Sequence, residues 1–302
     1  MPDKIAVGTV SRTFFCLPYW IAVENGYFAA ENLETSLTIY GNASQIPLLL
    51  EGSLNVIIGT PEAALHSTVA GGPVRIIAGN AGRLTHSLMA RPPFSRVEDL
   101  KGGTIGILNM VEGTFFQIKE MLAAHGLHYP GDYKVKETGG APARHKALLD
   151  GSIDAGLQSI PWNYAEIDAG LKHLGDVVEY VPDWQFVTVN ASSVWAEAHR
   201  SQIVGFLRAM LRATDWLYQN RAGAAVIAAR ELPTSVEYAG RAWDHYTQTN
   251  ALTRDVSVNV EGLRRVIDTQ IEADLLPKDA PTGIEAYVID EYLKEARASL
   301  DR

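Results

Sequence analysis

The chain has 302 residues, of which 47% are hydrophobic and 20% are charged, and its formal net charge is −9 at pH 7. This composition is typical of a globular protein with an acidic surface, and without a basic segment nucleic acid is not expected as a partner. The single cysteine, Cys16, excludes an internal disulfide and a cysteine-based zinc site, and no apolar window of 18 residues predicts a membrane-spanning helix.

From the N-terminus, short apolar runs alternate with segments of helical spacing. Residues 4–10 and 103–108 each predict a buried strand, followed by a polar turn and a Thr-Phe-Phe sequence that opens a helix. These helices are expected to end before Gly26 and Gly126, because a glycine just past the last apolar position is a stop signal. Further strands are predicted at 36–40 and 54–59 in the first half, and at 133–137 and 153–158 in the second.

The two halves of this region share more than their order of elements. Residues 48–61 read LLLEGSLNVIIGTP and residues 147–161 read ALLDGSIDAGLQSIP, so Gly52 and Gly151 occupy matching positions. Each half therefore reads as strand–helix–strand–helix–strand. Strands that alternate with helices of this length predict parallel sheets with right-handed crossovers.

The pattern changes after the second unit. One more strand is predicted at 185–190, and helices are predicted at 199–220, 222–231, 236–245, 260–273 and 284–300. Extended segments at 75–79 and 87–91 are expected to lead from the first unit to the second. The expected fold is α/β with two lobes, each a mainly parallel sheet flanked by helices, and with extra C-terminal helices. We expect lobe boundaries at 1–86 plus 187–302 for the first lobe and 87–186 for the second.

Two such lobes are expected to face each other across a cleft, because ligands bind beyond the carboxyl ends of parallel strands. Helix N-termini in the turns that line the cleft offer free N–H groups and the positive end of the helix dipole, which favour an anion. Thr13 and Thr114 are interpreted as caps of two such helices, with hydroxyls that also donate to a bound oxygen. The alternative for each is a plain N-cap without a ligand.

Five segments carry a family resemblance through their order and spacing. They are WIAVENGYF at 20–28, LEGSLNV at 50–56, VEDLKG at 97–102, ALLDGSIDA at 147–155 and the helix at 203–218. In these segments the chain resembles the type II periplasmic solute-binding proteins of the nitrate, sulfonate and taurine class, which includes proteins similar to thiamin-pyrimidine-precursor binders. The resemblance covers nearly the whole chain. It implies the periplasmic-binding-protein type II fold, a two-lobed clamp that closes by a hinge motion on a small anionic or zwitterionic molecule.

By position, the resemblance implies ligand contacts in the turns of both lobes and in the crossovers. The candidate ligand-binding residues are Ser11, Arg12, Thr13, Phe14, Asn42, Ser44, Thr60, Pro61, Glu62, Asn80, Arg83, Asn109, Glu112, Gly113, Thr114, Gly139, Gly140, Ser159, Trp162, Trp184 and Asn190. Arg12 could make a bidentate contact to a carboxylate or sulfonate, or could be a solvated loop arginine. Phe14, Trp162 and Trp184 could stack on an organic ligand or could belong to the core.

Other side chains of these turns also have two interpretations. Phe15 and Phe116 fall on the inward faces of their helices and are expected in the core. Glu62 and Glu112 could bind an amine, or could be helix caps stabilised by the dipole. Glu62 follows Pro61 in the first lobe whereas Trp162 follows the matching proline in the second, and this asymmetry is where we expect specificity to arise.

No residue is assigned a catalytic role. If the fold carries an enzyme, the candidates for its acid, base or nucleophile are Cys16, Glu62, His66, His86 and Glu112. Resembling proteins include a sulfinate desulfinase with a nucleophilic cysteine near the first turn, where our alignment places Thr13, with Cys16 one turn into the helix. They also include a thiamin-pyrimidine synthase with a cysteine-rich motif that this chain lacks. The histidines show no metal-ligand spacing, so neither a metal nor a cofactor is expected.

Three functions remain open at this stage. The leading hypothesis is a non-catalytic solute-binding protein that delivers a sulfonate, carboxylate or pyrimidine-like molecule to the permease of an ABC importer. The alternatives are a cytoplasmic enzyme, such as a decarboxylase, desulfinase or lyase acting on a small aromatic acid, and a cytoplasmic ligand sensor. The start MPDKIAVGTV has no signal-peptide pattern. The expected location is therefore the periplasm if a leader has been removed, and the cytoplasm if Met1 is the native start.

Overall fold

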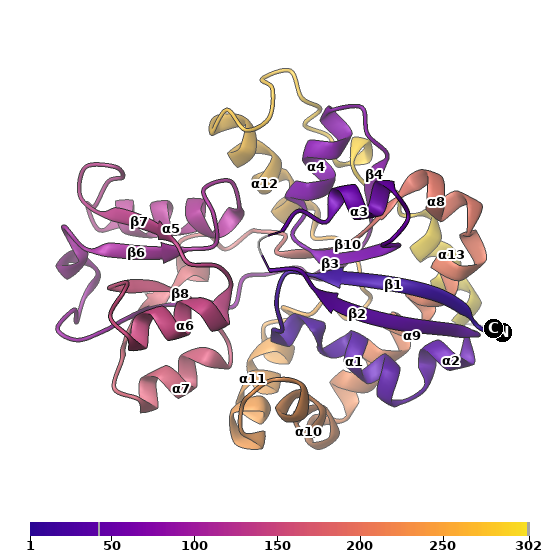
Figure 1. Ribbon diagram of the computed structural model, residues 1–302, viewed down its shortest axis with the longest axis horizontal. Coiled ribbons are helices and arrows are strands. Elements are labelled where there is room, and N and C mark those ends of the chain that lie inside the picture. The colour runs from indigo at the N-terminus through magenta and orange to yellow at the C-terminus, as the bar shows by residue number, and fades with distance from the viewer. Residues whose placement is uncertain (42, 301–302) are drawn as a thin grey trace.

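The computed structural model describes residues 1–41 and 43–300. Two five-stranded sheets lie towards opposite ends of the long axis of the molecule, and helices flank each sheet (Figure 1). We call the part built on the first sheet lobe I and the part built on the second sheet lobe II. The predicted two-lobed α/β fold is confirmed, and each of the two sheets is mixed.

The sheet of lobe I has the strand order β2-β1-β3-β10-β4. Its strands are β1 (Asp3–Thr9), β2 (Leu33–Ile39), β3 (Val56–Gly59), β4 (Val74–Ala81) and β10 (Val187–Ser192). Strand β1 pairs in parallel with β2 and β3, whereas β10 is antiparallel to β3 and to β4. All six residues of β10 are buried, in keeping with its place inside the sheet.

The sheet of lobe II repeats this arrangement with the order β7-β6-β8-β5-β9. Its strands are β5 (His86–Ala90), β6 (Thr104–Ile107), β7 (Lys134–Glu137), β8 (Ala155–Ser159) and β9 (Lys172–Asp176). Strand β5 is antiparallel to both of its neighbours, β8 and β9. In each lobe, the antiparallel strand is therefore the one that arrives from the other lobe: β5 follows β4, and β10 follows the last elements of lobe II.

Helices cover both faces of each sheet, and the C-terminal ones extend lobe I (Figure 1). In lobe I these are the 3₁₀ helix η1 (Phe14–Cys16), α1 (Leu17–Glu24), α2 (Tyr27–Ala30), α3 (Ile46–Leu50), α4 (Glu62–Val69), α8 (Ser193–Ala198), α9 (Arg200–Gln219), α10 (Arg221–Glu231), α11 (Val236–Gln248), α12 (Val260–Glu272), η4 (Ile284–Ala286) and α13 (Glu291–Leu300). In lobe II they are η2 (Val97–Leu100), α5 (Gly113–Ala124), α6 (Ala141–Leu149), α7 (Trp162–Asp168) and η3 (Val177–Glu179).

The glycines that mark the predicted helix ends behave as expected. Gly26 and Gly126 have φ of 70° and 76°, just beyond α1 and α5. The matching Gly52 and Gly151 have φ of 80° and 76°, and lead into β3 and β8. Left-handed backbone is accessible to glycine without a steric cost, so these four positions terminate helices at equivalent places in the two lobes.

The structure adds to or differs from the expected elements at three places. The extended segments at 75–79 and 87–91 lead from lobe I to lobe II as expected, and they do so as strands of the two sheets: residues 75–79 lie in β4 and residues 87–90 in β5. Strand β9 was not predicted. The helix expected at 284–300 is interrupted, because the Ile76 amide donates to the Tyr287 carbonyl (2.9 Å) and the Ile289 amide donates to the Ile76 carbonyl (2.8 Å). These two bonds satisfy backbone groups of β4 at the edge of the sheet.

Candidate functional site

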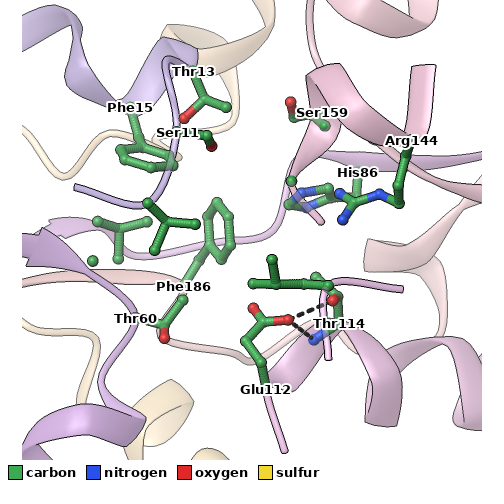
Figure 2. Close-up of a pocket in the computed structure, with 16 residues that line it drawn as sticks. Ser11, Thr13, Phe15, Thr60, His86, Glu112, Thr114, Arg144, Ser159 and Phe186 are labelled. Atoms are coloured by element: carbon green, nitrogen blue, oxygen red, sulfur yellow. Dashed lines mark hydrogen bonds between the residues drawn. The ribbon is translucent and has the colours of Figure 1, made fainter. Parts of the chain in front are cut away.

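The carboxyl ends of both sheets border a cavity between the lobes. Its hollow measures about 520 Å³, a figure that includes the open space at its mouth. Lobe I contributes the turn after β1, the end of β3 and the start of β10, and lobe II contributes the starts of β5, α5 and α6 and the end of β8 (Figure 2). We call this cavity the inner compartment. It is lined by seven of the predicted residues: Ser11, Thr13, Thr60, Glu112, Thr114, Gly140 and Ser159. Whether they contact a ligand stays a prediction.

Arg144, which sequence reasoning missed, places a buried positive charge in the wall of this cavity. It lies near the start of α6, and its side chain runs back towards β8, where Nε donates to the Leu157 carbonyl at 2.8 Å. Nη1 donates to the carbonyl of Gly139 at 2.7 Å. Burial lowers the pKa of Arg144 to about 10, while Glu112 and Glu166 act in the opposite direction. The guanidinium therefore remains a cation at neutral pH.

His86 lies beside Arg144 at the first position of β5 (Figure 2). Burial and, secondarily, the Arg144 charge lower the pKa of His86 to about 3, so its imidazole is neutral. Among the described residues, no partner is present for His86 Nδ1, for the Ser159 hydroxyl or for the Thr13 hydroxyl. All three side chains are more than nine-tenths buried and line the cavity. Polar groups that are buried without a partner are costly, and a polar ligand would satisfy them.

The inner compartment also has an apolar wall, to which Phe15 contributes instead of the expected Phe14. Phe15, expected in the core, is buried yet lines the cavity and makes an edge contact with Phe186 at a centroid distance of 5.8 Å. Phe14, the predicted ligand contact, points away and stacks on Tyr246 of α11 at 4.6 Å. The chain enters α1 through a 3₁₀ turn, so the direction of successive side chains differs there from that of a regular α-helix.

Glu112 and Glu62 meet where α5 of lobe II approaches α4 of lobe I. Glu112, not Thr114, is the N-cap of α5: its Oε2 accepts hydrogen bonds from the Thr114 amide (3.0 Å) and hydroxyl (2.5 Å) (Figure 2). The prediction that Thr114 caps this helix is therefore wrong. Glu62 Oε1 accepts a hydrogen bond from the Gly113 amide across the lobes at 3.1 Å. Burial and then Glu112 raise the pKa of Glu62 to about 7, and burial also raises the pKa of Glu112.

An outer compartment adjoins the inner one and shares Thr60 and Glu112 with it. It is lined by the predicted residues Ser44, Glu62, His66 and Asn109. His66 Nε2 lies 3.0 Å from Gln270 Oε1 of α12, and Gln270 Nε2 donates to the Val111 carbonyl at 3.1 Å. The C-terminal helix α12 therefore contacts both sides of the outer compartment. The predicted Asn42 lies outside the described residues.

The remaining predicted contacts do not line either compartment. They are Arg12, Phe14, Pro61, Asn80, Arg83, Gly113, Gly139, Trp162, Trp184 and Asn190. Arg12 is half exposed and pairs with Glu231 at 2.9 Å instead of facing the cavity, and Arg83 is exposed. Asn80 supports the site from behind, because its Nδ2 donates to the Phe15 carbonyl at 2.9 Å.

Trp184 and Cys16 are both enclosed. Trp184 is 1% exposed and packs against Gly113, where an added Cβ would lie 2.7 Å from the indole ring. Cys16 is 0% exposed, and burial raises the pKa of its thiol to about 11. The thiol is therefore protonated at neutral pH, unlike the thiolate that nucleophilic catalysis requires.

One local sequence signal could have pointed to Arg144. It stands in GGAPARH, where a glycine turn and a proline open a helix and an arginine follows within the first turns. An arginine at a predicted helix start in a cleft turn is a candidate for an anion contact. The same reasoning had selected Arg12, which the fold turns outwards towards α10.

Two kinds of feature are absent from residues 1–41 and 43–300. No group of three or more His, Cys, Asp or Glu side chains is arranged to hold a metal ion. No helix in this part of the chain is both long and apolar enough to cross a membrane.

Comparison with known proteins gives one family. The family model described as NMT1/THI5 like matches residues 14–224. A formylaminopyrimidine-binding protein of Halalkalibacterium halodurans is 24% identical in an alignment of 220 residues that covers 67% of this chain. The chain spans less than two thirds of that relative, 62% of its length.

Solved structures show the same fold at low sequence identity. The ligand-binding component of an ABC-type import system from Staphylococcus aureus has a TM-score of 0.78 at 15% identity, covering 97% of this chain and 99% of that one. The alkanesulfonate-binding protein SsuA from Xanthomonas axonopodis, bound to MOPS, has a TM-score of 0.75 at 17% identity, with coverages of 96% and 99%. The periplasmic-binding-protein fold expected from the sequence is thus confirmed.

Proposed function

The chain belongs to the NMT1/THI5-like family, and from this premise we propose that it is a solute-binding protein whose two lobes clamp a small organic anion. The observation that carries the proposal is Arg144, a buried cation in the wall of a cavity between the lobes. An anion bound there would gain a charge-assisted hydrogen bond in a site that excludes water. The unpartnered hydroxyls of Thr13 and Ser159 would supply donors from opposite lobes.

The two crossovers between the lobes form the proposed hinge. Gln185 Nε2 donates to the Ala81 carbonyl (3.0 Å) in one crossover and to the Val187 carbonyl (2.7 Å) in the other. Both connections therefore lie side by side and can bend together, as in hinge closure of two domains around a ligand. We propose that the moving units are 1–86 with 187–302, and 87–186.

The partner and location are proposed on the same basis. The Staphylococcus aureus neighbour is named as the ligand-binding component of an ABC-type import system, and this supports a permease as the partner. We propose that the protein works on the outer side of the membrane, in the periplasm, where a permease would receive its ligand. Sequencing the gene together with its 5′ flank, and fractionating cells that express it from its own promoter, tests this location.

The test of the binding role compares two arginines. Ligands are found by thermal shift with a panel of sulfonates, carboxylates and pyrimidines, and affinities are then measured by calorimetry. We expect Arg144→Met to weaken binding of an anionic hit by about 100-fold, because truncating one partner of a buried charged hydrogen bond costs roughly 3 kcal/mol. Arg144→Lys should recover part of this loss, since it keeps the charge without the planar donor pair.

Arg12→Met is the matched control, because Arg12 is half exposed and faces α10 rather than the cavity. It should leave affinity unchanged, and circular dichroism checks that each variant is folded. Wild-type affinity in a folded Arg144→Met variant would refute this placement of the site. Each hit is also recovered after long incubation and analysed by mass spectrometry. Conversion of the hit to a product would contradict a purely binding role.

A further inference from the structure

Two acidic side chains from different lobes meet in the wall of the cavity. Glu62 is the first residue of α4 in lobe I, and Glu112 caps α5 in lobe II. They are 7% and 8% exposed. The Gly113 amide, which follows Glu112 directly, donates to Glu62 at 3.1 Å. This arrangement of the lobes thus brings two mostly buried carboxyl groups into the same part of the wall.

The hydrogen bonds of this pair are incomplete. Glu112 Oε2 accepts two hydrogen bonds from Thr114, and the Arg144 charge favours the ionised form of Glu112. Glu62 has its Oε1 at the Gly113 amide, while its Oε2 is buried and has no hydrogen-bond partner among the described residues. The nearby Thr60 hydroxyl and the Gly113 amide lower the pKa of Glu62, but burial and Glu112 outweigh them. Two buried like charges are unfavourable, so a pair of this kind holds either a proton or an added donor such as a ligand N–H.

The charged groups are distributed unevenly along the cavity, with the cation in one compartment and the acids towards the other. Arg144 lines only the inner compartment and Glu62 lines only the outer one, whereas Glu112 lines both. A ligand that lies along the cavity therefore meets a fixed cation at one end and acceptor oxygens at the other. An anion without a donor group would leave Glu62 Oε2 unsatisfied at the cost of an unpaired buried acceptor.

We propose that Glu62 and Glu112 form a nitrogen subsite, which binds an amino, amidino or ammonium group of a ligand whose acidic group lies at Arg144. This inference rests on the proposed function, since it specifies the ligand of the same cavity. It names the ligand class as small organic acids that also carry a nitrogen donor, such as aminosulfonates and amino-substituted aromatic acids. Such a ligand joins lobe I to lobe II through one polar group on each side of the cavity.

The test uses matched probes that differ only in the nitrogen. Taurine is compared with ethanesulfonate, and 4-aminobenzoate with benzoate, by calorimetry at pH 7.5. For at least one pair, we expect the wild-type protein to bind the amino member at least tenfold more tightly. In Glu62→Gln and Glu112→Gln this preference should fall to less than threefold, because each variant removes a carboxylate that accepts from the nitrogen. Glu34→Gln, at an exposed position of β2, is the control and should keep the preference.

The outcomes separate this inference from the proposed function. Equal binding of both members of each pair, with loss of both in Arg144→Met, would overturn the nitrogen subsite and leave the anion clamp standing. A preference that persists in the Glu62→Gln/Glu112→Gln double variant would also overturn it. If neither these probes nor the wider panel of organic acids binds, the anion clamp itself is refuted, and the nitrogen subsite with it.

Discussion

Replacing Glu62 by glutamine should make the protein more stable at alkaline pH without changing its stability in acid. The side chain is buried at the junction of the lobes, and glutamine keeps its shape and can still accept the hydrogen bond from the Gly113 amide. Burial and Glu112 raise the pKa of Glu62 from 4.5 to about 7. The folded protein therefore holds a proton on this group over a pH range in which the unfolded chain has released it.

The sign and size follow from proton linkage. A carboxyl whose pKa is raised on folding contributes its full stability below pH 4.5, and this contribution is lost as the pH rises towards 7. Each unit of pKa difference between the folded and unfolded states corresponds to about 1.4 kcal/mol, so the loss of stability amounts to roughly 3 kcal/mol. The free energy of unfolding of Glu62→Gln, relative to wild type, should therefore increase by roughly 3 kcal/mol between pH 4 and pH 8.5.

The assay is equilibrium urea unfolding at half-unit pH steps, followed by tryptophan fluorescence and by circular dichroism. Glu34→Gln, an exposed glutamate variant, serves as the control and should track wild type at every pH. If Glu62→Gln and wild type show parallel pH profiles, then Glu62 is ionised in the folded protein without a cost. The account of a desolvated acid pair would then be wrong.

Three further outcomes follow from burial and exposure. Leu88→Ala, at a fully buried position of β5 between β8 and β9, should lower the free energy of unfolding by about 2–5 kcal/mol in urea titration. A loss below about 1 kcal/mol would contradict close packing there. Iodoacetamide at pH 8 should alkylate Cys16 at least about 100-fold more slowly in the native protein than in urea, because the thiol is enclosed and burial raises its pKa to about 11. Comparable rates in mass-spectrometric time courses would show that the thiol is reactive in the native protein. Glu120→Gln removes an ion pair with Arg265 (2.5 Å) that joins α5 to α12. Because both side chains are more than a third solvent-accessible, the loss of stability in the same titration should stay below about 1 kcal/mol. A larger loss would identify this pair as a latch between the lobes.

Much of the fold could be predicted from local sequence signals. The repeated glycines at 26 and 126, and at 52 and 151, end helices because left-handed backbone favours glycine, and this preference acts wherever the residue lies in the fold. The apolar runs that predict β1, β3, β6 and β8 are also local signals, since strands covered on both faces are rich in apolar residues. Strand β9 could not be predicted in this way, because its residues, KHLGD, are mostly polar and lie at a sheet edge.

The candidate site could be predicted only in outline. The turns after the strands, where the sequence places the site, do line the cavity, because parallel strands end at a common edge. That a ligand binds there stays a prediction. The choice of side chains within those turns was less successful. Arg12 and Phe14 have the right residue types but face α10 and α11, helices that begin more than 200 residues later in the chain. No local pattern encodes which way a loop residue turns when a distant helix competes for it.

The sequence by itself determined the duplicated unit, the number and order of most strands, and the edges at which a ligand would lie, because periodicity and turn chemistry are local properties. The tertiary structure alone decided that Arg144 faces the cavity while Arg12 leaves it, and that Glu62 meets Glu112. These two acids are far apart in the chain, and only the approach of the lobes removes them from water together. The charges that define the candidate site therefore acquire their properties from burial between lobes, which no stretch of sequence contains.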